Sequence, residues 1–177
     1  MPGMALPKDY TSQDCSLARA LEVVGERWTL LIVRDAFFGV RRFGDFVAHL
    51  AIPRAVLTHR LAFLVEEGVL TVAPGPHGHD EYELTAKGLD LWPVIRSLLA
   101  WGDGYYSAKG PRRVYRHAGD SGEIAPDGSC AACGGTPAVA DLVVGPGPGW
   151  SPRPGKSDLV TVALAGSHRL LTSIRSS

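Results

Sequence analysis

The segment from Phe43 to Gly68, which reads FGDFVAHLAIPRAVLTHRLAFLVEEG, constrains the fold more than any other part of the chain. Apolar residues recur at helical spacing on both sides of the short connection LAIP. Pro53 suits the first turn of a helix, because its missing N–H leaves no hydrogen bond unmade, and Gly68 is a predicted helix stop. The segment therefore predicts two short helices joined by a tight turn.

The flanking segments extend this pair into a larger arrangement. Helical spacing predicts two helices before it, over residues 15–25 and 26–39, and one long helix after it, over residues 85–110. In between, VLTVAP and HDEYELT flank the turn GPHG and predict a β-hairpin. A three-helix core followed by a hairpin is the winged helix-turn-helix arrangement, in which the last core helix enters the major groove of DNA.

The character of the chain changes near residue 110. Beyond it the sequence is rich in glycine and proline and holds only short β-like runs, with a strand and a short helix expected among the last residues. The predicted fold class is therefore α+β. We expect a winged helix-turn-helix domain for DNA binding and dimerisation at residues 10–110 and a small β-rich C-terminal domain at residues 111–177.

The second helix of the central pair has one apolar and one polar face. The residues predicted to point inward are Val56, Leu57, Leu61 and Leu64, and those predicted to point outward are Arg54, Ala55, Thr58, His59 and Ala62. An outward arginine can form paired hydrogen bonds with guanine, and the hydroxyl and imidazole can contact base edges or phosphates. The alternative is that these residues are only the solvated face of an amphipathic helix.

Three segments of the chain resemble the HxlR-type bacterial winged-helix regulators. They are CSLARALEVVGERWTLLIVRDAFFGVRRFGDF, IPRAVLTHRLAFLVEEGVL and YELTAKGLDLWPVIRSLLAWG. The resemblance implies a homodimeric transcriptional regulator that binds double-stranded DNA, with the first and last helices of the winged-helix domain forming the dimer interface. Two features depart from the family: Pro53 stands where a serine usually opens the recognition helix, and the hairpin carries acidic residues where Lys or Arg is usual.

Charge is informative only locally. Formal net charge is zero, with 18 Lys plus Arg against 18 Asp plus Glu, but residues 34–60 hold five arginines against two aspartates. The predicted DNA-binding residues are Arg41, Arg42, Pro53, Arg54, Ala55, Thr58, His59 and His77.

The last predicted helix carries more aromatic surface than a small core can easily cover. Its large residues are Trp92, Trp101, Tyr105 and Tyr106. Aromatic residues are favoured in interfaces, so this helix is a predicted dimer contact. The alternative is that the aromatic residues pack against the C-terminal domain.

The three cysteines fall into two groups. Cys15 lies at a helix start, where unpaired N–H groups favour the thiolate, and its position matches a cysteine that senses oxidants or electrophiles in some family members. It is a candidate redox sensor, or else a packing residue of the dimer interface. Cys130 and Cys133 have the spacing of a zinc knuckle, with His117 as the nearest further ligand. Zinc, a redox disulfide and free thiols all remain open for this pair.

Several functional classes receive no support from the sequence. No apolar run is long enough to span a bilayer and the N-terminal residues lack the pattern of a signal peptide, so a cytoplasmic protein is expected. The chain has no nucleophile-and-base motif and no phosphate loop, so no enzymatic activity is predicted. The expected function is transcriptional regulation as a homodimer on a two-fold symmetric operator, in response to redox, electrophile or small-molecule signals. The alternative is a metal-binding or enzymatic module in the C-terminal domain, with the helical domain serving dimerisation.

Overall fold

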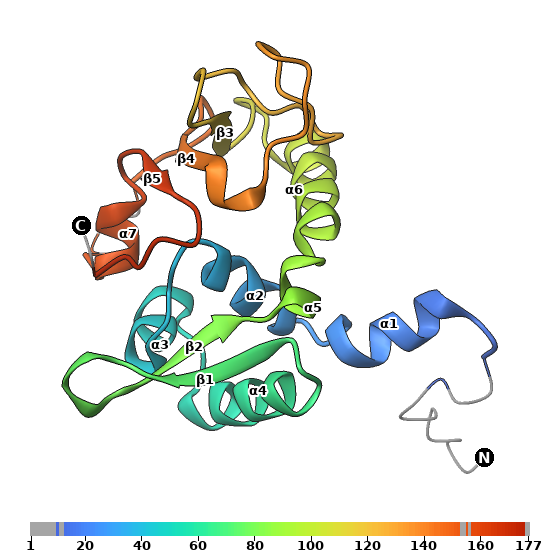
Figure 1. Cartoon of the computed structure of the whole chain (residues 1–177), viewed down its shortest axis with the longest axis vertical. Coiled ribbons are helices and arrows are strands. Elements are labelled where there is room, and N and C mark those ends of the chain that lie inside the picture. The colour runs from blue at the N-terminus through green and yellow to red at the C-terminus, as the bar shows by residue number, and fades with distance from the viewer. Residues whose placement is uncertain (1–9, 11–12, 153–154, 156, 176–177) are drawn as a thin grey trace.

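The computed structural model describes residues 10, 13–152, 155 and 157–175 (Figure 1). The helices are α1 (Ser16–Val24), α2 (Thr29–Phe37), α3 (Phe43–Leu50), α4 (Arg54–Glu66), α5 (Ala86–Leu89), α6 (Trp92–Tyr106) and α7 (Leu159–Ala163). The strands are β1 (Leu70–Pro74), β2 (Asp80–Leu84), β3 (Arg113–His117), β4 (Leu142–Pro146) and β5 (His168–Arg169), and 3-10 turns cover Pro76–Gly78 and Val139–Asp141.

Helices α2, α3 and α4 and the hairpin β1–β2 form the winged helix-turn-helix. The turn between α3 and α4 is tight because Ala51 adopts a left-handed conformation, with φ 54°, and Ile52 is buried beneath it. Strands β1 and β2 pair antiparallel from Leu70 opposite Leu84 to Pro74 opposite Asp80. The N–H of Tyr82 also donates to the carbonyl oxygen of Arg41 at 2.8 Å, which ties the hairpin to the segment before α3.

The long helix predicted over residues 85–110 is two helices. Helix α5 ends at Leu89, and α6 starts at Trp92 with Pro93 in its first turn. Proline has no N–H to donate to the carbonyl four residues earlier, and its ring crowds that carbonyl. The helix therefore breaks at this point and restarts, so that α6 runs away from the winged-helix core toward the C-terminal region (Figure 1).

The region beyond residue 110 is built on a small antiparallel sheet, with strand order β3-β4-β5. One buried apolar cluster runs through both parts of the molecule. It includes Phe37 of α2, Trp92 of α6 and Tyr115 of β3, and the Trp92 ring lies 5.0 Å from that of Phe37 in a tilted contact and 5.4 Å from that of Tyr115 in an edge-to-face contact. The predicted fold class, a winged helix-turn-helix with a small β-rich C-terminal region, is confirmed.

Residues 168–175, here called the C-terminal strap, return to the winged-helix core. The N–H of Leu171 donates to the carbonyl oxygen of Phe37 at 2.8 Å, and that of Ile174 donates to the carbonyl oxygen of Gly39 at 3.2 Å. Arg175 forms a bidentate ion pair with Asp45 of α3, at 2.7 and 2.8 Å. The strap thus joins the connection between α2 and α3 to the end of the C-terminal region.

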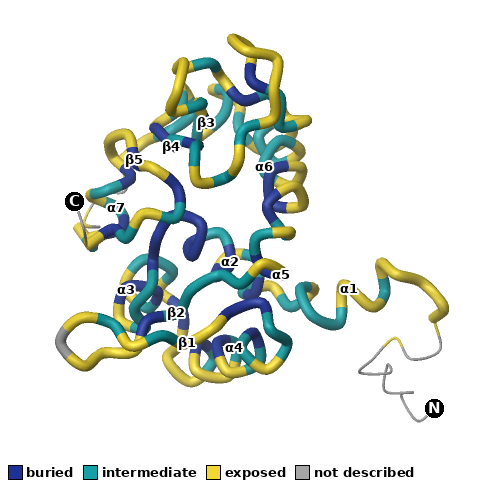
Figure 2. Tube along the Cα trace, viewed as in Figure 1, coloured by how far each residue is buried: buried dark blue, intermediate teal, exposed yellow. Residues whose placement is uncertain are grey.

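Helix α1 stands away from the rest of the molecule (Figure 1), and none of its residues is buried (Figure 2). Its apolar residues Leu17 and Leu21 are 66% and 40% exposed. A helix of nine residues is marginal in water without packing, so α1 has an apolar side available for a partner. Within the described residues, none of the helices has the length and apolar character to cross a bilayer.

Candidate nucleic-acid interface

Helix α4 buries one side and exposes the other. Leu57, Leu61 and Leu64 are at most 1% exposed and anchor the helix on the core. The residues expected to point outward are all exposed: Arg54, Ala55, Thr58, His59 and Ala62. Pro53, also exposed, is the N-cap residue and supplies no side-chain hydrogen bond to the helix start. The first two turns of α4 thus present a flat surface of short side chains and one arginine.

Arg54 and Thr58 are held by local contacts on this surface. The Arg54 guanidinium lies over the ring of Phe43, with 5.3 Å between its central carbon and the ring centroid. This contact attracts the cation to the ring face and limits the number of side-chain conformations. The Thr58 hydroxyl donates to the carbonyl oxygen of Arg54 at 3.0 Å, so its oxygen is available to a partner as an acceptor.

Arg41 and Arg42 face the hairpin rather than open solvent. Arg41 pairs with Glu83 at 2.6 Å and donates to the carbonyl oxygen of Leu171 at 3.2 Å. Arg42 pairs with Glu81 at 3.3 Å, and Arg41 is 3.8 Å from the same carboxylate. The two arginines therefore neutralise part of the acidic hairpin and fix its position. The side chain of His77, the predicted contact at the hairpin tip, lies outside the described part of the structure.

Cys15 precedes the first turn of α1 and is exposed. The backbone N–H groups of Ala18 and then of Leu17 at the helix start favour the thiolate and lower the pKa of the thiol. A lower pKa gives a larger thiolate fraction at neutral pH, and the thiolate is the reactive form. The alternative, a packing residue of the dimer interface, stays a prediction, because that interface would be formed with a second chain.

The C-terminal region brings His117 together with Cys130 and Cys133 and adds a residue that the sequence analysis did not name. Asp120 joins them, and the ligand atoms of the four side chains all lie within 4.8 Å of one another. The N–H of Gly122 donates to Asp120 at 2.8 Å and is the main cause that lowers the pKa of this carboxyl. Desolvation by burial opposes it, His117 and the two thiols lower the pKa further, and the resulting pKa is about 2. The carboxylate is therefore ionised at neutral pH.

Comparisons with known proteins match the winged-helix region and more. A family model described as HxlR-like helix-turn-helix matches residues 23–110. The HTH-type transcriptional regulator Rv3095 of Mycobacterium tuberculosis is 44% identical over 142 residues, which cover 78% of this chain and 89% of that protein. The HTH-type transcriptional regulator YdeP of Bacillus subtilis is 31% identical over 103 residues, 55% of this chain and 80% of that one.

A solved structure agrees with these sequence matches. The crystal structure of PA1607, a protein assigned as a transcription factor, superposes on this chain with a TM-score of 0.58 and 41% sequence identity. The superposition covers 70% of this chain and 88% of the PA1607 chain. Both this match and the mycobacterial one cover more of the chain than residues 1–110 contain, so both include part of the C-terminal region. The chain belongs to the HxlR-like helix-turn-helix family of transcriptional regulators.

Proposed function

We propose that this regulator binds a two-fold symmetric operator as a homodimer and reads it with the exposed face of α4. The observation that carries the proposal is the division of α4 into a buried leucine face and an exposed face around Arg54 and Thr58. In winged helix-turn-helix proteins this helix lies in the major groove, where arginine reads guanine and short side chains allow close approach.

Exposed apolar residues on two helices support the dimer. On α6, Trp101, Tyr105 and Tyr106 are 56%, 74% and 70% exposed, and the Trp101 ring contacts both tyrosine rings, whereas Trp92 of the same helix packs into the core. On α1, Leu17 and Leu21 are exposed as well. Exposed apolar residues of this kind on two helices are typical of a protein interface. Two copies joined there would hold two α4 helices in a fixed relation, as a palindromic site requires.

The proposed phosphate contacts are Arg41 and Arg42. In the free protein both are paired with hairpin carboxylates, so part of their charge is already neutralised. We propose that they act on DNA mainly by positioning the hairpin beside the backbone, with a direct contribution to phosphate binding that is smaller than that of two unpaired arginines.

Two features support a signal-responsive regulator. One is the exposed, activated thiol of Cys15. The other is a cavity of about 180 Å³ between the winged helix and the C-terminal region, lined by Arg34, Arg112, Arg113 and Trp150, with Asp103 as its one acidic residue. The Tyr115 hydroxyl, which is buried beside this cavity, has no hydrogen-bond partner among the described residues. The lining suits a small aromatic anion.

Selection of bound fragments from genomic DNA tests the central proposal. We expect one palindromic motif to be enriched over a non-specific competitor. In a gel-shift assay, DNA that carries this motif should be retarded by a complex that contains two chains. If no motif is enriched at any salt concentration, α4 does not read sequence and the proposal is wrong.

A further inference from the structure

We propose that His117, Asp120, Cys130 and Cys133 form a zinc site with four protein ligands that fastens the segment of residues 117–135 to the C-terminal sheet. The site lies outside the DNA-binding surface, and nothing in the proposed regulation requires it. The site is supported by the distances between the side chains, by the type of ligands and by the backbone that positions them.

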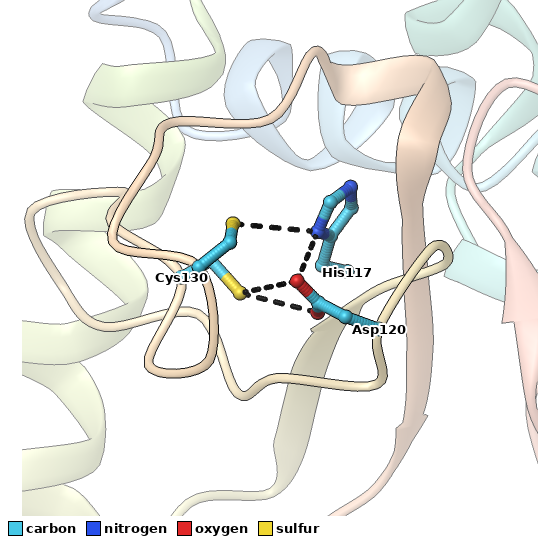
Figure 3. Close-up of side chains that lie close together, drawn as sticks. His117, Asp120 and Cys130 are labelled. Atoms are coloured by element: carbon cyan, nitrogen blue, oxygen red, sulfur yellow. Dashed lines mark hydrogen bonds and ion pairs between the residues drawn. The ribbon is translucent and has the colours of Figure 1, made fainter.

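The distances match the edges of a coordination tetrahedron. Zinc lies about 2.0 to 2.3 Å from nitrogen, oxygen and sulfur ligands, so two ligands of one tetrahedral ion are about 3.3 to 3.8 Å apart. Asp120 Oδ2 is 3.6 Å from Cys130 Sγ, and Cys133 Sγ is 3.7 Å from His117 Nδ1. His117 Nδ1 is 3.0 Å from Asp120 Oδ2 (Figure 3). Three of the ligand–ligand distances are thus close to the edge of a zinc tetrahedron, and all four ligand atoms lie within 4.8 Å of one another.

The ligand types select the metal. Two sulfurs, one imidazole nitrogen and one carboxylate oxygen are a combination that zinc accepts, whereas magnesium and calcium prefer oxygen alone. Binding displaces the two thiol protons, and two thiolates with one carboxylate offset the 2+ charge of the ion. Four protein ligands leave no position for a substrate, so the site is structural rather than catalytic.

The backbone holds the two cysteines in a knuckle. The N–H of Gly134 donates to the carbonyl oxygen of Cys130 at 2.8 Å, and the N–H of Cys130 donates to the carbonyl oxygen of Gly135 at 2.8 Å. Gly134 adopts φ 72°, a conformation that glycine accepts without strain. The turn directs both sulfurs to the same side of the loop, which is the function of this motif in zinc ribbons.

The turn that carries Asp120 also has a defined backbone conformation. Ser121, with φ 62°, reverses the chain after β3, and this turn places Asp120 beside His117. A Cβ atom at Gly122 would lie 2.4 Å from Cys130 Sγ and 2.8 Å from the nitrogen of Ala132, so only glycine permits this close approach of the two loops. A redox disulfide between Cys130 and Cys133 would need neither the aspartate nor the histidine.

The site is connected to helix α6 through one buried arginine. Arg96 of α6 donates to the carbonyl oxygens of Ile124 and Ala125 at 3.2 and 3.3 Å. Ile124 in turn forms an isolated β-bridge with Cys130. Removal of the metal is therefore expected to loosen the segment that covers this part of α6.

The test is metal analysis of the full chain, purified without chelator from cells grown with added zinc. We expect about one zinc per chain in the wild type, and at least a tenfold weaker zinc affinity in Cys133→Ser and Asp120→Ala, measured by competition with a chromophoric chelator. Both replaced side chains are exposed, so these variants are expected to fold. Asp127→Asn is the matched control, because Asp127 lies in the same segment but caps Ser129 instead of facing the four ligands, and it should bind zinc as the wild type does.

A second measurement does not depend on any variant. Cobalt(II) added to the metal-free wild type should give the intense visible bands of a tetrahedral ion and a thiolate charge-transfer band in the near ultraviolet. Less than 0.1 zinc per chain together with a cobalt spectrum lacking the thiolate band would overturn the proposal. A disulfide between Cys130 and Cys133 in metal-free protein of unchanged thermal stability would overturn it too, and unchanged affinity in Asp120→Ala would remove Asp120 from the site.

Discussion

Arg54 is the residue on which sequence recognition should depend most. Arg54→Ala is expected to weaken operator binding by about 1 to 3 kcal/mol, because a bidentate contact with a base is lost, and to relax preference at one position of each half-site. Fluorescence anisotropy with the operator and with single-base variants measures both effects. Arg60→Ala is the matched control, since Arg60 is on the same helix but is half-buried and lies 3.8 Å from Glu26. An equal loss in both variants would show that only net charge matters.

The thiols should differ in reactivity. The backbone N–H groups of Ala18 and Leu17 lower the pKa of Cys15. At Cys133 the backbone N–H of Gly135 lowers the pKa, but Cys130, Asp120 and burial together outweigh it and raise the pKa. A lowered pKa means that the thiolate persists to lower pH. In metal-free protein we therefore expect iodoacetamide to label Cys15 before Cys133 at pH 7, with the two rates converging as pH rises. Mass spectrometry of timed digests checks the order, and faster labelling of Cys133 would contradict it.

Residue identity alone could predict only part of the candidate sites. The face of α4 was predictable because leucines at helical spacing fix which side is buried. The spacing of Cys130 and Cys133 predicted only half of a metal site, and His117 was a candidate because it is the nearest further ligand in the sequence. Asp120 was not predictable, because it reaches the site only through the left-handed turn at Ser121. The contacts of Arg41 and Arg42 with Glu81 and Glu83 were also missed, since the antiparallel register of the hairpin sets them.

Among the elements, the C-terminal strap contributes most directly to the stability of the winged helix. Gly39 adopts φ 82°, and a Cβ atom there would lie 1.8 Å from the carbonyl oxygen of Thr172. Gly39→Ala is therefore expected to destabilise the protein by at least about 2 kcal/mol, from backbone strain together with displacement of the strap. Urea unfolding at fixed protein concentration measures the change.

Gly44→Ala is the control for this substitution. Gly44 lies in α3, and no heavy atom would be within 4 Å of an added Cβ atom. Alanine favours a helix over glycine by about 1 kcal/mol, so this variant should be as stable as the wild type or slightly more stable. If both variants have the same free energy of unfolding as the wild type, the strap is not packed against Gly39 in solution.

The elements themselves were mostly predictable, and the exceptions have identifiable causes. Periodicity located α2, α3, α4 and the hairpin because each has one face on the core. The break between α5 and α6 was missed because the spacing of the apolar residues around Pro93 is compatible both with a bend in one helix and with the first turn of a new helix. The return of the strap to α2 and α3 leaves no periodic signal, since it depends on single hydrogen bonds between segments far apart in sequence.

At the scale of the whole molecule, the exposed apolar surfaces of α1 and α6 predict the oligomeric state. Light scattering should give about twice the chain mass for the wild type, and Trp101→Glu or Leu17→Glu should shift the mass toward that of one chain, because a buried unpaired carboxylate is costly. Leu159→Glu is the matched control: Leu159 is an apolar residue of α7 that is 50% exposed and lies outside the proposed interface. A wild type that stays monomeric at micromolar concentration would contradict the prediction.

The C-terminal strap also has a consequence for the order in which the protein is made. Asp45 and Arg175, which form the bidentate pair, are separated by 130 residues. At a synthesis rate of about 5–20 residues per second, α3 waits on the order of ten seconds for this partner to emerge from the ribosome. During that interval the connection between α2 and α3 lacks the hydrogen bonds that Leu171 and Ile174 later supply. The helix-turn-helix of a nascent chain is therefore synthesised well before the strap that stabilises it. Binding by chaperones and cleavage by proteases should occur mainly before the strap has been synthesised.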